Sequence, residues 1–346
     1  MSGEILHKEI YEQPQVIADF LESESEKVRS ITQKLGETFQ YLLIAARGSS
    51  DNAARYAQYV FGSLNRLPVA LATPSLFTLY DRPPRMQGAC VVGISQSGQS
   101  PDILAVVEEG CRQGQPTLAI TNDPESPLAE AAEYVIPLHA GPEKAVAATK
   151  TYTASLAALA LMSCHLDDDQ ERLGVLQGLP DLMRETLKDN QAVIETAERY
   201  RFMERCVVIG RGYNYATAFE VSLKITELTR IIAESYSSAD FMHGPIAMVD
   251  QGFPILLIAP SGNVLEDLKS LVDRLESLQA EMLIISDDRS LLSRAQVALP
   301  LQARVPEWVS PLLAVLPGQL YSLGLAQARG MDPDRPHGLT KVTETW

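Results

Sequence analysis

The feature that most limits what this chain can fold into is an internal repeat. Two pairs of matched segments carry it: LIAARGSSDNAARYA (43–57) with VVIGRGYNYATAFEV (207–221), and VVGISQSGQSPDIL (91–104) with LLIAPSGNVLEDLK (256–269). Gly48 and Gly212 are 164 positions apart, and so are Gly98 and Gly262. Because the landmarks recur at one offset, we predict two domains built from one ancestral unit.

Each repeat alternates short apolar strands with segments of helical period, which is typical of a parallel sheet covered by helices on both faces. We therefore predict an α/β fold. Another matched pair, TLAITND (117–123) and LIISDD (283–288), supplies a strand to each repeat. A polar, helix-forming stretch at about 165–200 is predicted to link the repeats. An N-terminal helical arm over residues 1–35 is predicted from apolar residues at helical spacing: Ile10, Ile17, Phe20, Leu21 and Val28.

Composition limits the partners of the chain. Its 346 residues carry a formal net charge of −15, so we expect no binding to nucleic acid or to an anionic membrane. The longest nearly unbroken apolar stretch, 156–162, is far shorter than the roughly 20 residues of a membrane-spanning helix, so no such segment is predicted. The N-terminus lacks the apolar core of a signal sequence. Four cysteines without CxxC spacing and five scattered histidines predict a cytoplasmic protein without a metal.

The turn SQSGQS (95–100) concentrates polar side chains between an apolar strand and a helix. Ligands of open parallel sheets bind beyond the carboxyl ends of strands, and a helix N-terminus attracts anions. Three serines add hydroxyl donors, Gln96 adds an amide, and Gly98 permits close approach. Since the turn has no lysine or arginine, we predict a phosphate monoester held by hydroxyls and amides. The alternative is that Ser97 or Ser100 only caps the helix, which needs one such residue.

The turn ARGSSDNAA (45–53) holds the equivalent place after the first strand. Ser49 and Ser50 are positioned to reach the same ligand, and Asn52 to cap the following helix. Taken alone, this motif is equally well explained as a capped turn without a ligand.

Five motifs, in order along nearly the whole chain, resemble the sugar isomerase (SIS) family: RGSS (47–50), SQSGQS (95–100), AVAATKTYT (145–153), EVSLKITEL (220–228) and DFMHGPIAMVD (240–250). They are most similar to the isomerase half of glutamine–fructose-6-phosphate aminotransferase, which KEIYEQPQ (8–15) and DRPHGLTK (334–341) also resemble. The resemblance implies two tandem SIS domains, each a flavodoxin-like αβα sandwich with a five-stranded parallel sheet. The expected boundaries are 36–175 and 190–330, followed by a tail, 331–346, over the active site.

The resemblance also implies which residues bind substrate, a sugar 6-phosphate held by the first domain. The implied phosphate and sugar ligands are Ser50, Ser95, Gln96, Ser97 and Ser100. In the stretch similar to the family's VASTK, Val146 and Ala148 would line the sugar. No metal or redox cofactor is implied.

Lys224 and Glu227 stand three apart on a predicted helix and so share a face. By resemblance, Glu227 is the base that shuttles a proton between sugar carbons, and Lys224 is a cationic partner near the carbonyl or enol oxygen. From spacing alone, a surface salt bridge is the commoner meaning of such a pair.

His243 and Lys341 receive their roles from the resemblance alone. His243 would open the sugar ring and reach a neighbouring subunit's site, which implies a homodimer. Lys341 matches the lysine that forms a Schiff base with the open-chain ketose. The alternatives are a structural turn residue beside Gly-Pro and a solvated tail lysine. We hypothesise that residues 335–346 fold over the sugar site, with apolar groups to bury at Leu339, Val342 and Trp346.

The sequence also departs from the aminotransferase pattern. It begins Met-Ser with only about 40 residues before the first predicted strand, so we expect no glutamine hydrolysis by this chain. Arg47 stands where the family usually has cysteine, and Asp51 where it has tyrosine. These features are more similar to stand-alone SIS-type glucosamine-6-phosphate deaminases.

We therefore predict an amino-sugar phosphate isomerase/deaminase, a hydrolase that converts glucosamine 6-phosphate and water to fructose 6-phosphate and ammonia. One alternative is the isomerase subunit of an aminotransferase that receives ammonia from a separate glutaminase. Another is a deglycase acting on fructosyl-amine 6-phosphates. A sugar-phosphate sensor is the non-enzyme alternative, disfavoured because the whole catalytic set is present and no basic helix-turn-helix segment is attached.

Overall fold

The computed structural model describes residues 2–36 and 38–341. The chain divides into two compact units, named here after the sequence repeat that each contains. The first-repeat unit comprises Gln13–Glu143, Lys150–Pro180 and the described residues of Thr340–Trp346. The second-repeat unit comprises the described residues of Met1–Glu12, together with Lys144–Thr149 and Asp181–Leu339.

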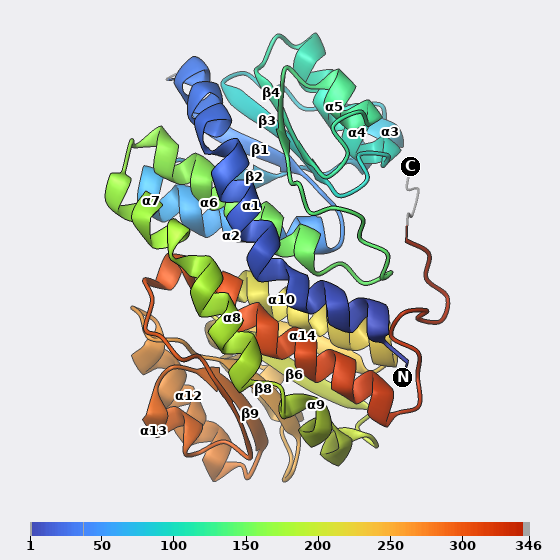
Figure 1. The fold of residues 1–346 in the computed structure, drawn as a ribbon, viewed down its shortest axis with the longest axis vertical. Coiled ribbons are helices and arrows are strands. Elements are labelled where there is room, and N and C mark those ends of the chain that lie inside the picture. The colour runs from blue at the N-terminus through green and yellow to red at the C-terminus, as the bar shows by residue number, and fades with distance from the viewer. Residues whose placement is uncertain (1, 37, 342–346) are drawn as a thin grey trace. The chain divides into compact units, whose positions relative to one another are not determined.

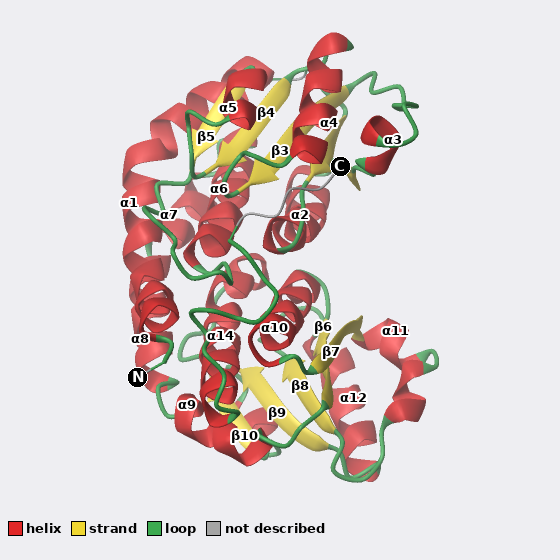
Figure 2. Ribbon diagram, turned by 90° about the vertical axis from the view of Figure 1, so that its right-hand side faces the viewer, coloured by secondary structure: helices red, strands yellow, loops and turns green. Residues whose placement is uncertain are grey.

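The first-repeat unit is built around a five-stranded parallel sheet in the order β2-β1-β3-β4-β5 (Figure 1). Its strands are β1 (Tyr41–Ala45), β2 (Val69–Leu71), β3 (Ala89–Ser95), β4 (Thr117–Thr121) and β5 (Tyr134–Pro137). Its helices are α2 (Ser49–Val60), α3 (Ser75–Thr78), α4 (Pro101–Arg112), α5 (Pro127–Ala131), α6 (Lys150–Leu166) and α7 (Gln170–Gln177), with a π-helical turn at Phe61–Asn65. Helices α2 and α6 pack together on one face of the sheet, whereas α4 packs with α3 and α5 on the other (Figure 2).

The second-repeat unit has a parallel sheet of the same kind, in the order β10-β9-β8-β6-β7. Its strands are β6 (Arg205–Gly210), β7 (Ile232–Ser237), β8 (Pro254–Ile258), β9 (Glu281–Ser286) and β10 (Val297–Pro300). Its helices are α10 (Asn214–Thr229), α11 (Ser238–Met242), α12 (Leu265–Ser277), α13 (Arg289–Leu292) and α14 (Ser310–Ala328), with 3-10 turns at Pro245–Met248 and Glu307–Val309. Between the repeats lie α8 (Leu179–Asp189), α9 (Val193–Thr196) and a 3-10 turn at Ala197–Tyr200.

The two sheets have the same topology. Counted from the first strand of each repeat, both follow the order 2-1-3-4-5, which is that of the flavodoxin-like fold. The prediction of two flavodoxin-like αβα domains with five-stranded parallel sheets is confirmed.

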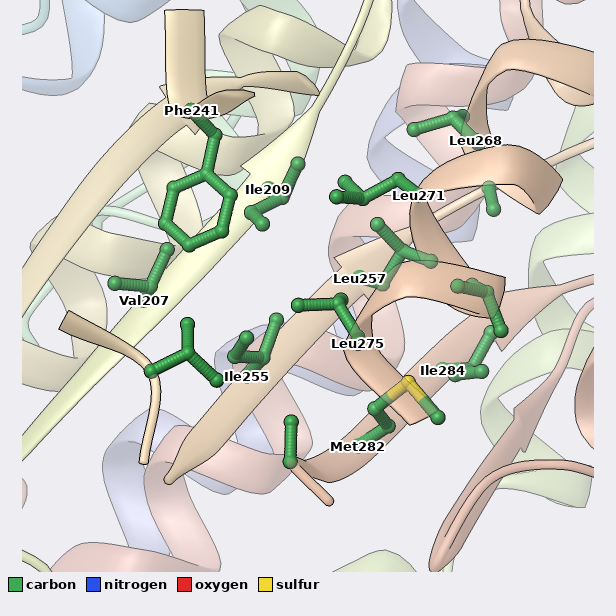
Figure 3. Close-up of a cluster of buried hydrophobic side chains, with 14 of the residues drawn as sticks. Val207, Ile209, Phe241, Ile255, Leu257, Leu268, Leu271, Leu275, Met282 and Ile284 are labelled. Atoms are coloured by element: carbon green, nitrogen blue, oxygen red, sulfur yellow. The ribbon is translucent and has the colours of Figure 1, made fainter. Parts of the chain in front are cut away.

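Alternating strand residues explain why each sheet needs helices on both faces. In the second-repeat unit, Val207 and Ile209 of β6 and Ile255 and Leu257 of β8 lie in one buried cluster with residues of α12 (Figure 3). Their neighbours Val208 and Leu256 are buried as well and point to the opposite face, because successive side chains of a strand alternate. Continuously apolar strands are therefore stable only inside a three-layer sandwich.

The predicted N-terminal arm is α1 (Glu4–Leu35), and the apolar residues that predicted it are all buried: Ile10, Ile17, Phe20, Leu21 and Val28. The expectation about membrane segments needs a correction. Among the described helices, Glu307–Ala328 is long and apolar enough to cross a membrane by length and composition, and the apolar window within it is 100% buried. Its complete burial identifies it as a core helix.

Candidate functional site

Two turns of the first-repeat unit end at the same edge of its sheet. Strands β1 and β3 are paired in parallel with Ala45 opposite Gly93, so their carboxyl ends are neighbours. The RGSS turn (47–50) leads from β1 into α2, and the SQSGQS turn (95–100) leads from β3 into α4. The predicted phosphate ligands therefore gather at the edge where open α/β sheets bind ligands.

Both helices that follow these turns begin without a side-chain cap. Gly48 at the N-cap of α2 has no side chain, and Ser100 at the N-cap of α4 makes no capping hydrogen bond. Helix α5 shows the contrast, because Ser126 accepts a hydrogen bond from Ala129 N–H there. The interpretation of Ser100 as a plain cap is therefore wrong. The amide donors and partial positive charge of two adjacent helix N-termini make this edge attractive to an anion.

The serine hydroxyls of the second turn hold its backbone and still have hydrogens to donate. Ser95 Oγ accepts from Gly98 N–H at 3.1 Å, and Ser97 Oγ accepts from Gln99 N–H at 3.3 Å. Because a hydroxyl is both an acceptor and a donor, each of these serines retains its O–H hydrogen for a ligand. Ser95 is buried, whereas Gln96, Ser97 and Ser100 are partly exposed. The turn thus has one buried hydroxyl donor and other side-chain donors that are accessible to solvent.

Gly98 is needed for the shape of this turn. Its φ of +63° lies in the left-handed region that favours glycine. A Cβ atom added at Gly98 would lie 2.0 Å from Ser126 Oγ, so no larger residue fits without moving the α5 N-terminus.

An ion pair joins the two turns. Arg47 Nε donates to Asp102 Oδ2 at 2.8 Å, and the Asp102 carboxylate, in the first turn of α4, is fully buried. Arg47 is half exposed. Since a buried carboxylate without a partner is strongly unfavourable, this pair fixes the RGSS turn beside the SQSGQS turn. Arg47, which replaces the family's usual cysteine, therefore has a structural partner that the sequence did not reveal.

Lys341 is tied to a buried carboxylate in the first-repeat unit. Its Nζ lies 2.8 Å from Glu143 Oε2, and the Glu143 side chain has no exposed surface. Glu143 also accepts hydrogen bonds from the N–H and the hydroxyl of Thr151, at 3.1 and 2.8 Å. The Lys341 side chain is 24% exposed, so it is not the fully solvated tail lysine of the alternative interpretation. Leu339 is 42% exposed, and Val342 and Trp346, predicted to be buried, lie outside the described residues.

Val146 and Ala148 lie in Lys144–Thr149, a segment that belongs to the second-repeat unit. Both are partly exposed and alternate with buried neighbours. The carboxylate of Glu9 fixes the start of the segment, because it accepts from Lys144 N–H at 2.5 Å and from Ala145 N–H at 3.2 Å. This exposure is what their predicted role, lining the sugar, requires.

The predicted base lies in a charge cluster on α10. Lys224 Nζ is 2.6 Å from Glu227 Oε2 and 3.5 Å from Glu220 Oε1. Lys224 and Glu220 are buried, whereas the Glu227 side chain is 23% exposed. A surface salt bridge is therefore the wrong description. The buried Lys224 ammonium balances the negative charge of Glu220 and holds the Glu227 carboxylate in place. Of these three side chains, only Glu227 has substantial exposed surface.

His243 stands apart from this cluster. It follows α11 at a turn, where its N–H donates to the Asp240 carbonyl at 3.1 Å, and its side chain is exposed. Within the described residues its imidazole makes no hydrogen bond or ion pair. The second-repeat unit thus carries Lys224, Glu227 and His243, and the first-repeat unit carries the serine turns and Lys341.

Sequence reasoning did not find three acidic residues that contact predicted site residues or Arg47. Glu220 could have been predicted, because it precedes Lys224 by four residues, a spacing that places both on one helix face. Asp102 and Glu143 had no local signal, since their partners Arg47 and Lys341 are 55 and 198 positions away.

Comparisons with known proteins identify the family and the fold. The family model for the SIS domain matches residues 40–163 and 202–326. Glutamine–fructose-6-phosphate aminotransferase [isomerizing] of Thermococcus kodakarensis is 34% identical over 343 residues, which cover 96% of this chain but only 57% of that protein. The C-terminal domain of glucosamine-fructose-6-phosphate aminotransferase from Francisella tularensis superimposes with a TM-score of 0.85 at 26% identity, covering 96% of this chain and 98% of that one.

Glucosamine-6-phosphate deaminase from Thermotoga maritima shares the fold, with a TM-score of 0.82 at 23% identity, covering 99% of this chain and 100% of that one. The two segments matched by the family model are the two repeats recognised in the sequence. The chain therefore belongs to the SIS family, as two SIS domains homologous to the isomerase half of glutamine–fructose-6-phosphate aminotransferase.

Proposed function

We propose that this chain is an amino-sugar 6-phosphate isomerase that releases ammonia from glucosamine 6-phosphate to give fructose 6-phosphate. The observation that carries the proposal is the pair of uncapped helix N-termini at one sheet edge, surrounded by serine hydroxyls. A phosphate monoester matches such a set of donors in charge and in number of acceptor oxygens. The guanidinium of Arg47, in the RGSS turn, is paired with Asp102, so hydroxyls and amides are proposed to supply the recognition.

In the proposed reaction, Glu227 is the general base. Once the sugar ring is open, its carboxylate takes the proton from C2 of the amino aldose, which leaves an enaminol. Return of the proton to C1 gives an imine at C2, and addition of water then releases ammonia and leaves the ketose. Lys224 contributes by holding the Glu227 carboxylate in one orientation, through the 2.6 Å contact.

Lys341 is the proposed nucleophile toward the open-chain ketose in the reverse direction, where attack of its neutral amine at C2 forms an imine and releases the carbonyl oxygen as water. To form an imine, its ammonium must first lose a proton, and Glu143 Oε2 at 2.8 Å is an acceptor within hydrogen-bond reach. The same carboxylate keeps the amine in one place, because it is itself fixed by Thr151.

Similarity to the aminotransferases supports a second candidate, the synthetic direction. Fructose 6-phosphate and ammonia from a separate glutaminase would then give glucosamine 6-phosphate. Two assays of the purified chain separate the candidates: ammonia release from glucosamine 6-phosphate, and glucosamine 6-phosphate formation from fructose 6-phosphate with ammonium. Unphosphorylated glucosamine is the control substrate, and fructosyl-amine 6-phosphates test a deglycase. Binding of sugar phosphates without turnover of any of them would contradict the proposal and favour a sensor.

The proposal extends to the assembly, location and domains of the protein. The active protein is a cytoplasmic homodimer in which His243 serves the partner subunit's site. Its domains are those predicted, with boundaries at 36–175 and 190–330 and a tail over the active site.

A further inference from the structure

The second-repeat unit contains the same pair of turns as the first. Arg211 follows β6 as Arg47 follows β1, at the 164-residue offset. Arg211 Nη1 lies 2.9 Å from Asp267 Oδ2 in the first turn of α12, which repeats the pairing of Arg47 with the first turn of α4. Both repeats therefore have the same turn framework, meaning the two turns after the first and third strands and the arginine–aspartate pair that links them.

What differs is that a carboxylate of the protein occupies the second pair of turns. Glu307 Oε2 accepts a hydrogen bond from Asn263 N–H at 2.7 Å, ahead of α12. A Cβ atom added at Gly262 would lie 2.4 Å from Glu307 Oε2, and one added at Gly212 would lie 3.2 Å from Glu307 Oε1. The carboxylate thus contacts both turns at once.

In the first-repeat unit no such carboxylate is found among the nearest atoms: a Cβ atom added at Gly98, the counterpart of Gly262, would lie 2.0 Å from Ser126 Oγ. A Cβ atom added at Gly48, the counterpart of Gly212, would meet no atom within 4 Å. The segments before α6 and before α14 each contain a glutamate, but the two carboxylates have different partners. The segment before α6 carries Val146 and Ala148, and the carboxylate of Glu143 is turned to Thr151 and Lys341. The 3-10 turn before α14 instead begins with Glu307.

We propose that Glu307 is a built-in anion that fills the second-repeat turns and so restricts phosphate binding to the first repeat. The inference rests on the proposed phosphate site of the first-repeat unit. Glu307 has this effect for two reasons: its oxygens use the amide donor that a phosphate would need, and its charge repels a second anion. It is therefore a specificity-determining residue, since it leaves one phosphate site per chain in a protein with two copies of the turn framework.

The test counts inorganic phosphate sites by isothermal titration calorimetry. We expect one equivalent per wild-type chain and two for Glu307→Ala. In a Ser97→Ala background, which weakens the first site, adding Glu307→Ala should restore one equivalent. Glu266→Ala is the matched control, because it removes a negative charge from the first turn of α12 but leaves Glu307 in place; it should add no site.

Glu307→Ser is the second variant, in case the alanine protein does not fold, and circular dichroism checks both. If folded Glu307→Ala and Glu307→Ser proteins bind no more phosphate than wild type, the inference is wrong while the proposed function stands. If wild type binds no phosphate but Glu307→Ala binds one equivalent, the inference holds and the proposed first site fails. A second equivalent in Glu266→Ala would also overturn the inference, because charge alone would then be the cause.

Discussion

At the scale of single residues, the internal repeat provides a matched pair of serines. Ser97 and Ser261 occupy equivalent turns, and the Glu307 carboxylate contacts the second of these turns. We expect Ser97→Ala to raise KM for glucosamine 6-phosphate by about tenfold or more, because a hydrogen bond to a charged group contributes roughly 1.5–3 kcal/mol. Ser261→Ala should leave KM unchanged. Steady-state kinetics of both variants check this, and equal effects of the two substitutions would contradict phosphate recognition by the first turn.

Glu227 allows a direct test of proton transfer. Glu227→Gln keeps the shape of the side chain and removes the base, so exchange of the sugar C2 hydrogen with solvent deuterium should fall to background. Binding of substrate should persist, because Lys224 retains Glu220 as its partner at 3.5 Å. NMR in D₂O measures the exchange. Exchange at the wild-type rate would assign the base to another residue, and loss of binding as well would indicate a structural role.

The cysteines differ in their surroundings, and their reactivity should differ accordingly. Burial raises the pKa of the Cys90, Cys164 and Cys206 thiols to about 12, whereas Cys111 is exposed. Because the thiolate is the reactive form, iodoacetamide should alkylate only Cys111 in the native protein. Mass spectrometry of digested peptides locates the label, and full alkylation in denaturant is the control. Rapid native labelling of a second cysteine would contradict the buried assignment.

At the scale of elements, the tail contributes to the start of the first helix. Asp334 accepts hydrogen bonds from the N–H groups of Ile5 and Leu6, at 3.2 and 2.8 Å, and thereby caps α1 from 328 positions away or more. We expect Asp334→Ala to lower the free energy of unfolding by about 1 kcal/mol, the usual contribution of an N-cap. Asp334→Asn keeps an acceptor oxygen and should cost less. Chemical denaturation of both variants checks the order, and an alanine variant as stable as wild type would contradict the cap.

The elements also show what sequence patterns can and cannot predict. The central strands and the turns after them were predictable. Apolar runs followed by glycine and serine are patterns of neighbouring residues, and they occur in both repeats. The caps and ion pairs were not, because Asp334, Glu143 and Glu307 act on segments far away in sequence. The apolar helix α14 is not evident from unbroken apolar runs, because Gln319, Ser322 and prolines interrupt a helix that is buried on every side.

At the scale of the whole molecule, the duplication gives two pairs of turns, and they differ in whether a carboxylate of the protein contacts them. In the second repeat Glu307 contacts both turns, whereas the first-repeat turns are proposed to bind a phosphate. The second repeat carries the Lys224 and Glu227 cluster instead. The proposed phosphate donors and the proposed base thus lie on different copies of the unit.

The last prediction concerns assembly. His243 is exposed on its turn and has no hydrogen bond or ion pair within the described part of the chain, which is what a residue serving the partner subunit's site requires. If the proposed homodimer works in this way, Glu227→Gln and His243→Ala chains are each inactive alone. A mixed dimer, however, has one site that combines an intact Glu227 with an intact His243 from the other chain. Half of the chains in a 1:1 mixture are then in mixed dimers, with one active site each, so activity should recover to about a quarter of the wild-type value.

Differently tagged chains, refolded together and purified through both tags, provide the mixed dimer directly. Its activity per dimer should be about half that of wild type, because one of its two sites is complete. A mixture of two Glu227→Gln preparations treated identically is the control and should stay inactive. If the doubly tagged dimer is formed and has no activity, both residues belong to the same chain's site, and the assignment of His243 to the partner subunit is wrong.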